Sequence, residues 1–135
     1  MSIFDWILSV FYRPTLERPS PKIRIQGHQV KLENGTLAVT GLDRCFIASI
    51  LPSNSMEPNI DDGMLVILDP VHFGDLTVGD IIWYQHPQFE AFHRIVEISI
   101  DTEWYCKTKG DNNTNVDPVK IRPEHIKGVW RITID

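Results

Sequence analysis

The sequence contains few cysteines and no cysteine motif. Cys45 and Cys106 are the only two, and there is no C-x-x-C pair and no ligand-like spacing between the histidines and cysteine or carboxylate residues. We therefore expect neither a metal nor another cofactor. A single disulfide could join the two cysteines, but each lies in an apolar run typical of a strand, which favours buried free thiols.

The sequence also lacks a long apolar run and a basic cluster. No stretch approaches the roughly 20 apolar residues that a membrane-spanning helix requires. Residues 2–12 are apolar but carry no positive leader and no small-residue cleavage site, so we expect no secretory signal here. The formal net charge of -5 argues against nucleic acid as a partner, since phosphate binding requires clustered basic residues. We expect a cytoplasmic or virion-associated protein and leave peripheral membrane contact open.

The residues that are present are typical of one β-rich globular domain. The chain has 135 residues with nine prolines and eight glycines, a length and composition that fit a single domain with many turns. Short apolar runs predict strands at residues 45–51, 64–68, 81–85, 91–100, 103–108 and 128–134, with a single helical turn at 123–126. We expect a mainly β fold, either an antiparallel barrel or a coiled pair of antiparallel sheets.

The N-terminal region differs from this pattern. Residues 1–21 predict an amphipathic helix over 3–12, capped by Ser2 and ended by Pro14, and then a proline-rich arm. Apolar residues occupy more than one side of this helix, so it could dock on its own domain, contact a partner chain or lie at a membrane surface. Residues 22–135 form the β domain, which begins with a hairpin whose turn is Asn34-Gly35.

A polar turn at residues 52–63 separates two of the predicted strands. It opens with Pro52, ends in Asp-Asp-Gly, and holds Ser53 and Ser55. A turn held between strands exposes a side chain while the scaffold fixes its direction, which suits a reactive hydroxyl. Ser55 is therefore our candidate nucleophile.

The Ser-Met-Glu-Pro box at residues 55–58 resembles the nucleophile box of the superfamily that joins type I signal peptidases to LexA-like self-cleaving repressors. Further matches follow in the family's order, from about Ile47 to the C-terminus: Gly79-Asp80, His93-Arg94-Ile95-Val96, residues 108–113 and Asp117. The resemblance implies a β domain of the signal peptidase/LexA-like type. The chain departs from the family's membrane-anchored signal peptidases because we find no anchor in it.

The resemblance also implies a catalytic base. A serine hydroxyl needs a base to remove its proton during attack; in bacterial signal peptidases and LexA-like proteins that base is a lysine. His93 stands at the corresponding position, as in the archaeal and endoplasmic-reticulum signal peptidases. A histidine, unlike a lysine, is largely neutral near pH 7 without deep burial.

The remaining site residues are also implied by the resemblance. A carboxylate should orient the imidazole, and we assign this role to Asp117, with Asp111 as a structural or supporting carboxylate; the two roles could be exchanged. The backbone N–H of Ser55 and the hydroxyl of Ser53 would form the oxyanion site. Met56 and Pro58 would shape the turn and the substrate pocket.

Three functions are compatible with these residues. The first is a serine endopeptidase that cleaves an extended peptide or protein segment after a small side chain. The second is LexA-like self-cleavage, although residues 1–46 contain no DNA-binding helix-turn-helix to release. The third is a non-catalytic structural protein, for example a virion component, that keeps the peptidase fold and assembles through residues 3–12.

Overall fold

The computed structural model describes residues 25–42 and 44–134. The predicted helix at residues 3–12 and the arm that follows it lie outside these ranges. Within the described ranges, no helix combines the length and apolar character that crossing a membrane requires.

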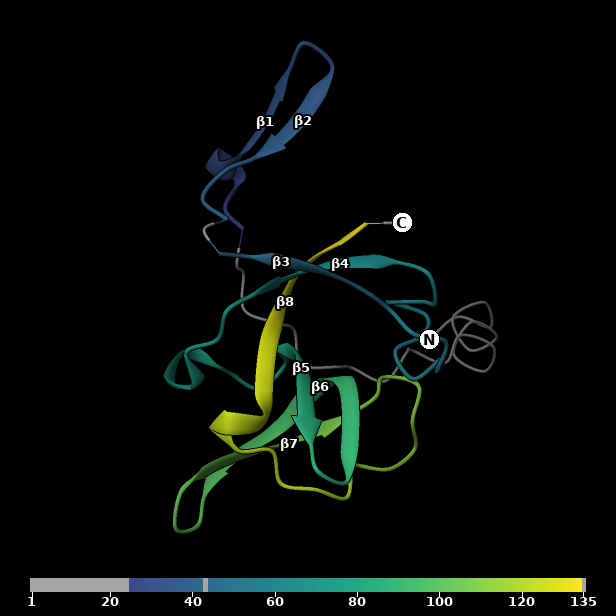
Figure 1. The fold of residues 1–135 in the computed structure, drawn as a ribbon, viewed down its shortest axis with the longest axis vertical. Coiled ribbons are helices and arrows are strands. Elements are labelled where there is room, and N and C mark those ends of the chain that lie inside the picture. Colours follow the sequence, from purple (N-terminus) through teal and green to yellow (C-terminus); the bar gives the residue numbers. More distant parts are fainter. Residues whose placement is uncertain (1–24, 43, 135) are drawn as a thin grey trace, which may run out of the picture.

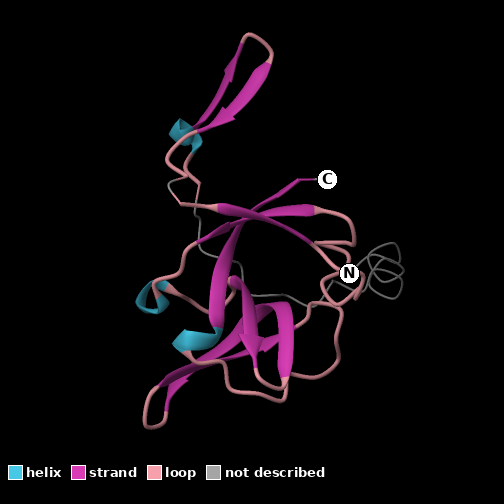
Figure 2. Cartoon of the chain, viewed as in Figure 1, coloured by secondary structure: helices cyan, strands magenta, loops and turns pink. Residues whose placement is uncertain are grey.

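The fold is mainly β, as predicted, and its strands are antiparallel (Figures 1 and 2). A six-stranded sheet has the order β3-β4-β8-β5-β6-β7, and a separate hairpin pairs β1 with β2. Because β3 and β7 end the order, the sheet is open, and the barrel that we considered is not formed. The strands are β1 (Val30–Glu33), β2 (Thr36–Val39), β3 (Phe46–Ser49), β4 (Leu65–Asp69), β5 (Ile81–His86), β6 (Phe89–Ile100), β7 (Trp104–Lys109) and β8 (Ile126–Ile134).

The helical content of the described residues is limited to 3-10 turns. The predicted turn at residues 123–126 is confirmed as η3 (Pro123–His125). Two others, η1 (Gly27–Gln29) and η2 (Phe73–Asp75), were not predicted. Each is a single turn of three residues, too short for an apolar periodicity, and neither begins with a proline as η3 does.

The N-terminal hairpin forms where Asn34-Gly35 predicted it. Both turn residues have positive φ, 49° for Asn34 and 76° for Gly35, as a two-residue hairpin turn requires. The hairpin projects away from the sheet (Figure 1). Its cross-strand pair Leu32 and Leu37 is exposed to solvent.

Two apolar clusters hold the sheet together, and β5 contributes to both because alternate side chains face opposite sides of a strand. Ile82 and Tyr84 belong to one cluster, while Ile81 belongs to the other and Trp83 packs against it. The first cluster consists of Leu76, Ile82, Tyr84, Ile95, Cys106, Val119, Ile121 and Val129. The second consists of Met56, Ile60, Val66, Leu68 and Ile81.

Both cysteines are free thiols, so the disulfide that we considered is not formed. Cys106 is fully buried in the first cluster, and burial raises the pKa of its thiol to about 12. The prediction of two buried thiols is wrong for Cys45. It is only half-buried and lies just before β3, where its Sγ faces a carboxylate oxygen of Asp69 at 3.5 Å.

Candidate active site

The turn at residues 52–63 connects β3 to β4 and is anchored in the protein core by two of its own apolar side chains. Met56 and Ile60 are each only 3% exposed and lie in the second apolar cluster. The backbone N–H groups of Asn59 and Ile60 both donate to the carbonyl of Met56 at 3.1 Å. Ser55 lies just before this anchor and is half-buried.

A second loop, residues 110–113, is hydrogen-bonded to the turn at residues 52–63, which we call the serine turn. The backbone N–H of Asn112 donates to the Ser55 carbonyl at 2.8 Å, and its side-chain amide donates to the Asn54 carbonyl at 3.0 Å. Gly110 allows this close approach, because a Cβ at that position would lie 2.7 Å from the Ser55 carbonyl oxygen. The backbone on both sides of the Ser55 side chain is therefore fixed.

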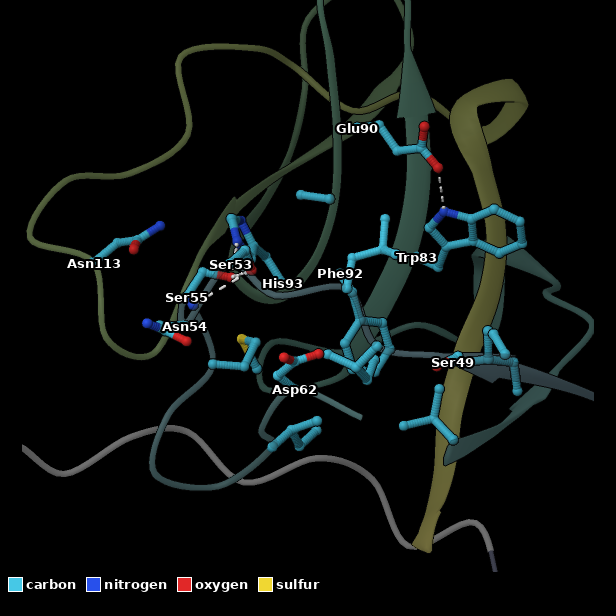
Figure 3. Close-up of a pocket in the computed structure, with 18 of the residues that line it drawn as sticks. Ser49, Ser53, Asn54, Ser55, Asp62, Trp83, Glu90, Phe92, His93 and Asn113 are labelled. Carbon is cyan, nitrogen blue, oxygen red and sulfur yellow. Dashed lines mark hydrogen bonds between the residues drawn. The ribbon is translucent and has the colours of Figure 1, made fainter. Parts of the chain in front are cut away.

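His93 faces Ser55 from β6, a strand that does not adjoin β3 or β4 in the sheet. It lies on β6 opposite Ile82 of β5 and is 3% exposed. Its Nε2 is 2.9 Å from Ser55 Oγ, and its Nδ1 is 2.7 Å from Asp117 Oδ2. Figure 3 shows the contact between His93 and Ser55. When Nδ1 donates its hydrogen to the Asp117 carboxylate, the Nε2 lone pair is directed at the serine hydroxyl.

Asp117 is buried, and one of its carboxylate oxygens, Oδ2, is the acceptor in three hydrogen bonds. Besides His93, the Thr108 hydroxyl donates to Oδ2 at 2.6 Å and the Tyr84 hydroxyl at 2.9 Å. Burial alone would raise the pKa of this carboxyl, but the hydrogen bonds from His93, Thr108 and Tyr84 outweigh burial and lower it. Asp117 is therefore held as a carboxylate beside the imidazole.

Tyr84 and Thr108 are the members of this site that sequence reasoning missed as functional residues. Both are buried. The pKa of the Tyr84 hydroxyl is raised, chiefly by burial, so it remains a hydrogen-bond donor. In the sequence, Tyr84 is one of several apolar residues of a predicted strand, so nothing marks its hydroxyl. Thr108 belongs to the motif at residues 108–113, which suggests no role for its hydroxyl.

Asp111 lies apart from His93 and binds Arg94 instead. The guanidinium Nε and Nη2 donate to the two carboxylate oxygens, each at 2.8 Å, and Nη1 donates to the Gly79 carbonyl at 3.1 Å. The Asn59 amide also donates to Asp111, at 2.9 Å. This buried ion pair ties the 110–113 loop to both β6 and the serine turn.

Of the other predicted site residues, Ser53 and Met56 lie at the site and Pro58 does not. Ser53 lies beside Ser55, with the two hydroxyl oxygens 3.1 Å apart and the Ser55 N–H 3.5 Å from Ser53 Oγ. Met56 lines the adjacent cleft. Pro58 is exposed and does not line it.

A cleft of about 610 Å³ opens beside Ser55 and His93 (Figure 3). One wall is residues 48–51 with the serine turn, and the other is Trp83 with residues 89–93. Among the described residues, each wall has a strand edge with no partner: β3 ends the sheet order, and β6 pairs with β7 only from Arg94 onward. The apolar side chains at the base are Met56, Ile60, Val66 and Leu68.

Comparison with known proteins identifies one kind of relative. Signal peptidase I W of Bacillus subtilis (strain 168) is 33% identical over 81 residues, which cover 58% of this chain and 43% of that protein. The chain thus spans less than half of the relative's length. No family model and no solved structure matches the chain. The similarity supports a signal peptidase I-like relationship and, with it, a peptidase-like function.

Proposed function

We propose that the protein is a serine endopeptidase of signal peptidase-like type, with Ser55 as nucleophile, His93 as general base and Asp117 as the carboxylate that orients His93. The observation that carries the proposal is the continuous chain of hydrogen bonds, 2.9 Å from Ser55 Oγ to His93 Nε2 and 2.7 Å from His93 Nδ1 to Asp117 Oδ2. Both distances lie within the range expected for a nucleophile and its base.

The proposed reaction begins with acylation. Ser55 Oγ attacks the peptide carbonyl carbon while His93 Nε2 takes the hydroxyl proton, and the Asp117 carboxylate stabilises the imidazolium that forms. The Ser55 N–H and the Ser53 hydroxyl donate to the developing oxyanion. His93 then gives its proton to the leaving amine as the C–N bond breaks, leaving an acyl-enzyme.

Deacylation uses the same residues. A water molecule enters the place of the departed amine and gives a proton to His93 as its oxygen attacks the acyl carbon. The C–O bond to Ser55 then breaks, and His93 returns the proton to Oγ. Ser55 and His93 are thereby restored for another turnover.

We propose that the substrate binds as an added strand. The edges of β3 and of residues 89–93 of β6 that no described strand pairs with border the cleft, so an extended peptide could hydrogen-bond to the backbone of either wall. Its side chains would alternate between the apolar base and solvent. A small residue before the cleaved bond remains our expectation from the family resemblance.

The test is covalent labelling of purified full-length protein with a serine-directed acylating probe. We expect labelling of the wild type, and loss of labelling in S55A because the nucleophile is removed. S99A is the matched control, since Ser99 lies at the far end of β6 and outside the cleft. Labelling that persists in S55A would reject Ser55 as the nucleophile.

A further inference from the structure

Glu90 lines the same cleft and is held in a defined position. Its Oε1 accepts a hydrogen bond from Trp83 Nε1 at 3.0 Å (Figure 3). It also accepts one from Gln85 Nε2 at 3.1 Å. These two donors, Gln85 first, lower the pKa of the carboxyl. Glu90 therefore presents a fixed negative charge at the wall of the cleft.

No cation of the described part of the chain neutralises the charge of Glu90. Both of its donors are neutral groups, and within residues 25–42 and 44–134 no ion pair involves it. A second carboxylate, Asp62, also lines the cleft, whereas no lysine or arginine among the described residues does. A cleft lined by charge of one sign attracts ligands of the opposite sign.

The register of β6 indicates where along a bound peptide this charge acts. Glu90 lies three positions from His93 on the edge that β7 leaves unpaired, which is about 10 Å along an extended strand. In a peptide added to this edge, the residue opposite Glu90 presents its side chain on the same face as Glu90. That residue would stand about three positions from the bond beside Ser55.

We propose that Glu90 is a specificity-determining residue, and that the preferred substrate carries a lysine or arginine about three positions from the cleaved bond. This inference rests on the proposed peptidase function. The cationic side chain would lie against the free oxygen of the Glu90 carboxylate. Asp62 adds to the same attraction from elsewhere in the cleft.

The experiment uses internally quenched peptides with alanine before the cleaved bond and with lysine, alanine or glutamate at each of four positions on either side. The kcat/KM ratio of the lysine to the alanine peptide is measured for wild type, E90Q and E97Q. We expect a ratio of about five at the third position in the wild type, as for one partly solvated ion pair. E90Q keeps an acceptor for Trp83 and Gln85 but removes the charge, so its ratio should fall to about one. E97Q, on β6 outside the cleft, should keep the wild-type ratio.

Binding of the same peptides to S55A, followed by fluorescence anisotropy, separates this inference from the peptidase proposal. Cleavage without lysine preference would overturn the inference and leave the peptidase function standing. If no peptide is cleaved but lysine-selective binding is seen and E90Q abolishes it, the peptidase function is overturned and the role of Glu90 stands. Neither cleavage nor selective binding would overturn both.

Discussion

Asp117 is the residue whose environment is most informative about chemistry. A buried carboxylate needs compensating hydrogen bonds, and Asp117 accepts them from His93, Thr108 and Tyr84. Two of these donors are neutral hydroxyl groups, so the negative charge is held in place without being neutralised. An imidazole that gains a proton beside this charge is stabilised, which is the role that a base–carboxylate pair plays in acyl transfer.

Replacement of Asp117 by asparagine tests this role at the residue scale. The amide removes the charge that stabilises a protonated His93 and can favour the wrong tautomer, so we expect kcat to fall by about 10³–10⁴-fold. The measurement is peptide cleavage under saturating substrate, with circular dichroism to show that the variant is folded. A folded D117N protein with nearly wild-type kcat would contradict the assignment.

The 110–113 loop is the element on which the serine turn depends. The Arg94–Asp111 pair is buried and connects the loop to β6, while Asn112 binds the carbonyls of Ser55 and Asn54. Removing one partner of a buried ion pair leaves the other charge uncompensated. The loop therefore couples the stability of the fold to the position of Ser55.

We expect D111A to lower the free energy of unfolding by about 3–5 kcal/mol and to slow labelling of Ser55. Urea denaturation and the rate of probe labelling measure the two effects. D75A is a suitable control, because Asp75 is exposed on η2 and its loss should change stability by less than about 0.5 kcal/mol. A stable D111A protein would show that the ion pair does not hold the loop.

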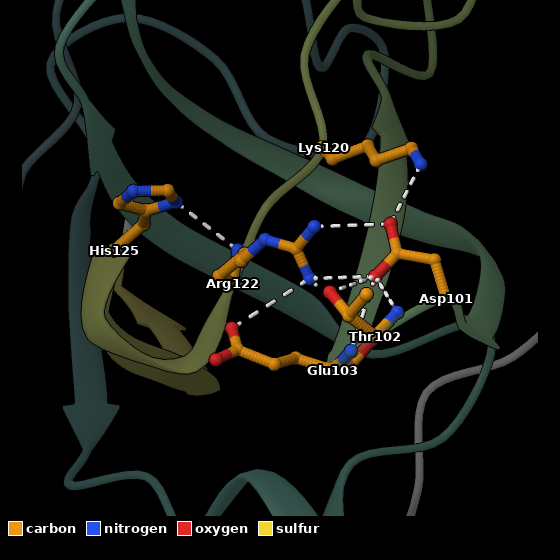
Figure 4. A network of polar contacts seen from close by, with 6 residues as sticks. All are labelled: Asp101, Thr102, Glu103, Lys120, Arg122 and His125. Carbon is orange, nitrogen blue, oxygen red and sulfur yellow. Dashed lines mark hydrogen bonds and ion pairs between the residues drawn. The ribbon is translucent and has the colours of Figure 1, made fainter.

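At the tip of the β6–β7 hairpin, Asp101 binds two cations from a distant segment (Figure 4). Its oxygens accept from Arg122 at 3.0 Å and 3.1 Å and from Lys120 at 2.8 Å. These contacts, Arg122 first, lower the pKa of the carboxyl well below its usual range. The contacts tie the hairpin to the chain segment that leads into η3.

A carboxyl whose pKa is lowered by folding stabilises the protein above its unfolded pKa and loses this contribution as pH falls through the folded value. The difference in melting temperature between wild type and D101N should therefore be largest at neutral pH and shrink below about pH 4. High salt should also reduce it, because these charges are exposed. A difference that is unchanged from pH 7 to pH 3 would contradict the assignment.

At the scale of the whole molecule, the strands and the hairpin turn could be predicted because their signals are local. Apolar runs bounded by Gly, Pro and Asp mark the strands, and Asn34-Gly35 permits the positive φ of its turn. The openness of the sheet could not be predicted, because pairing of strands far apart in sequence leaves no local pattern. Cys45 was wrongly predicted to be buried because it lies just outside β3, where the burial pattern of the strand does not extend.

The candidate site likewise has residues that the sequence could identify and residues that only the fold reveals. Motif order singled out Ser55, His93 and Asp117 from positions far apart in the chain, and their hydrogen bonds are consistent with that grouping. The sequence left the roles of Asp111 and Asp117 exchangeable; only the geometry distinguishes the carboxylate at His93 from the one at Arg94. Tyr84 and Glu90 carry no motif, so their contacts with the site emerge only from the fold.

The most direct test of the central claim, that His93 takes a proton from Ser55, is the pH dependence of Ser55 acylation. The probe adduct on Ser55 is followed by mass spectrometry in the wild-type protein from about pH 8 to about pH 5. We predict that the acylation rate falls as pH falls, because a protonated imidazole cannot accept the hydroxyl proton. An acylation rate that is constant over this range would contradict the account.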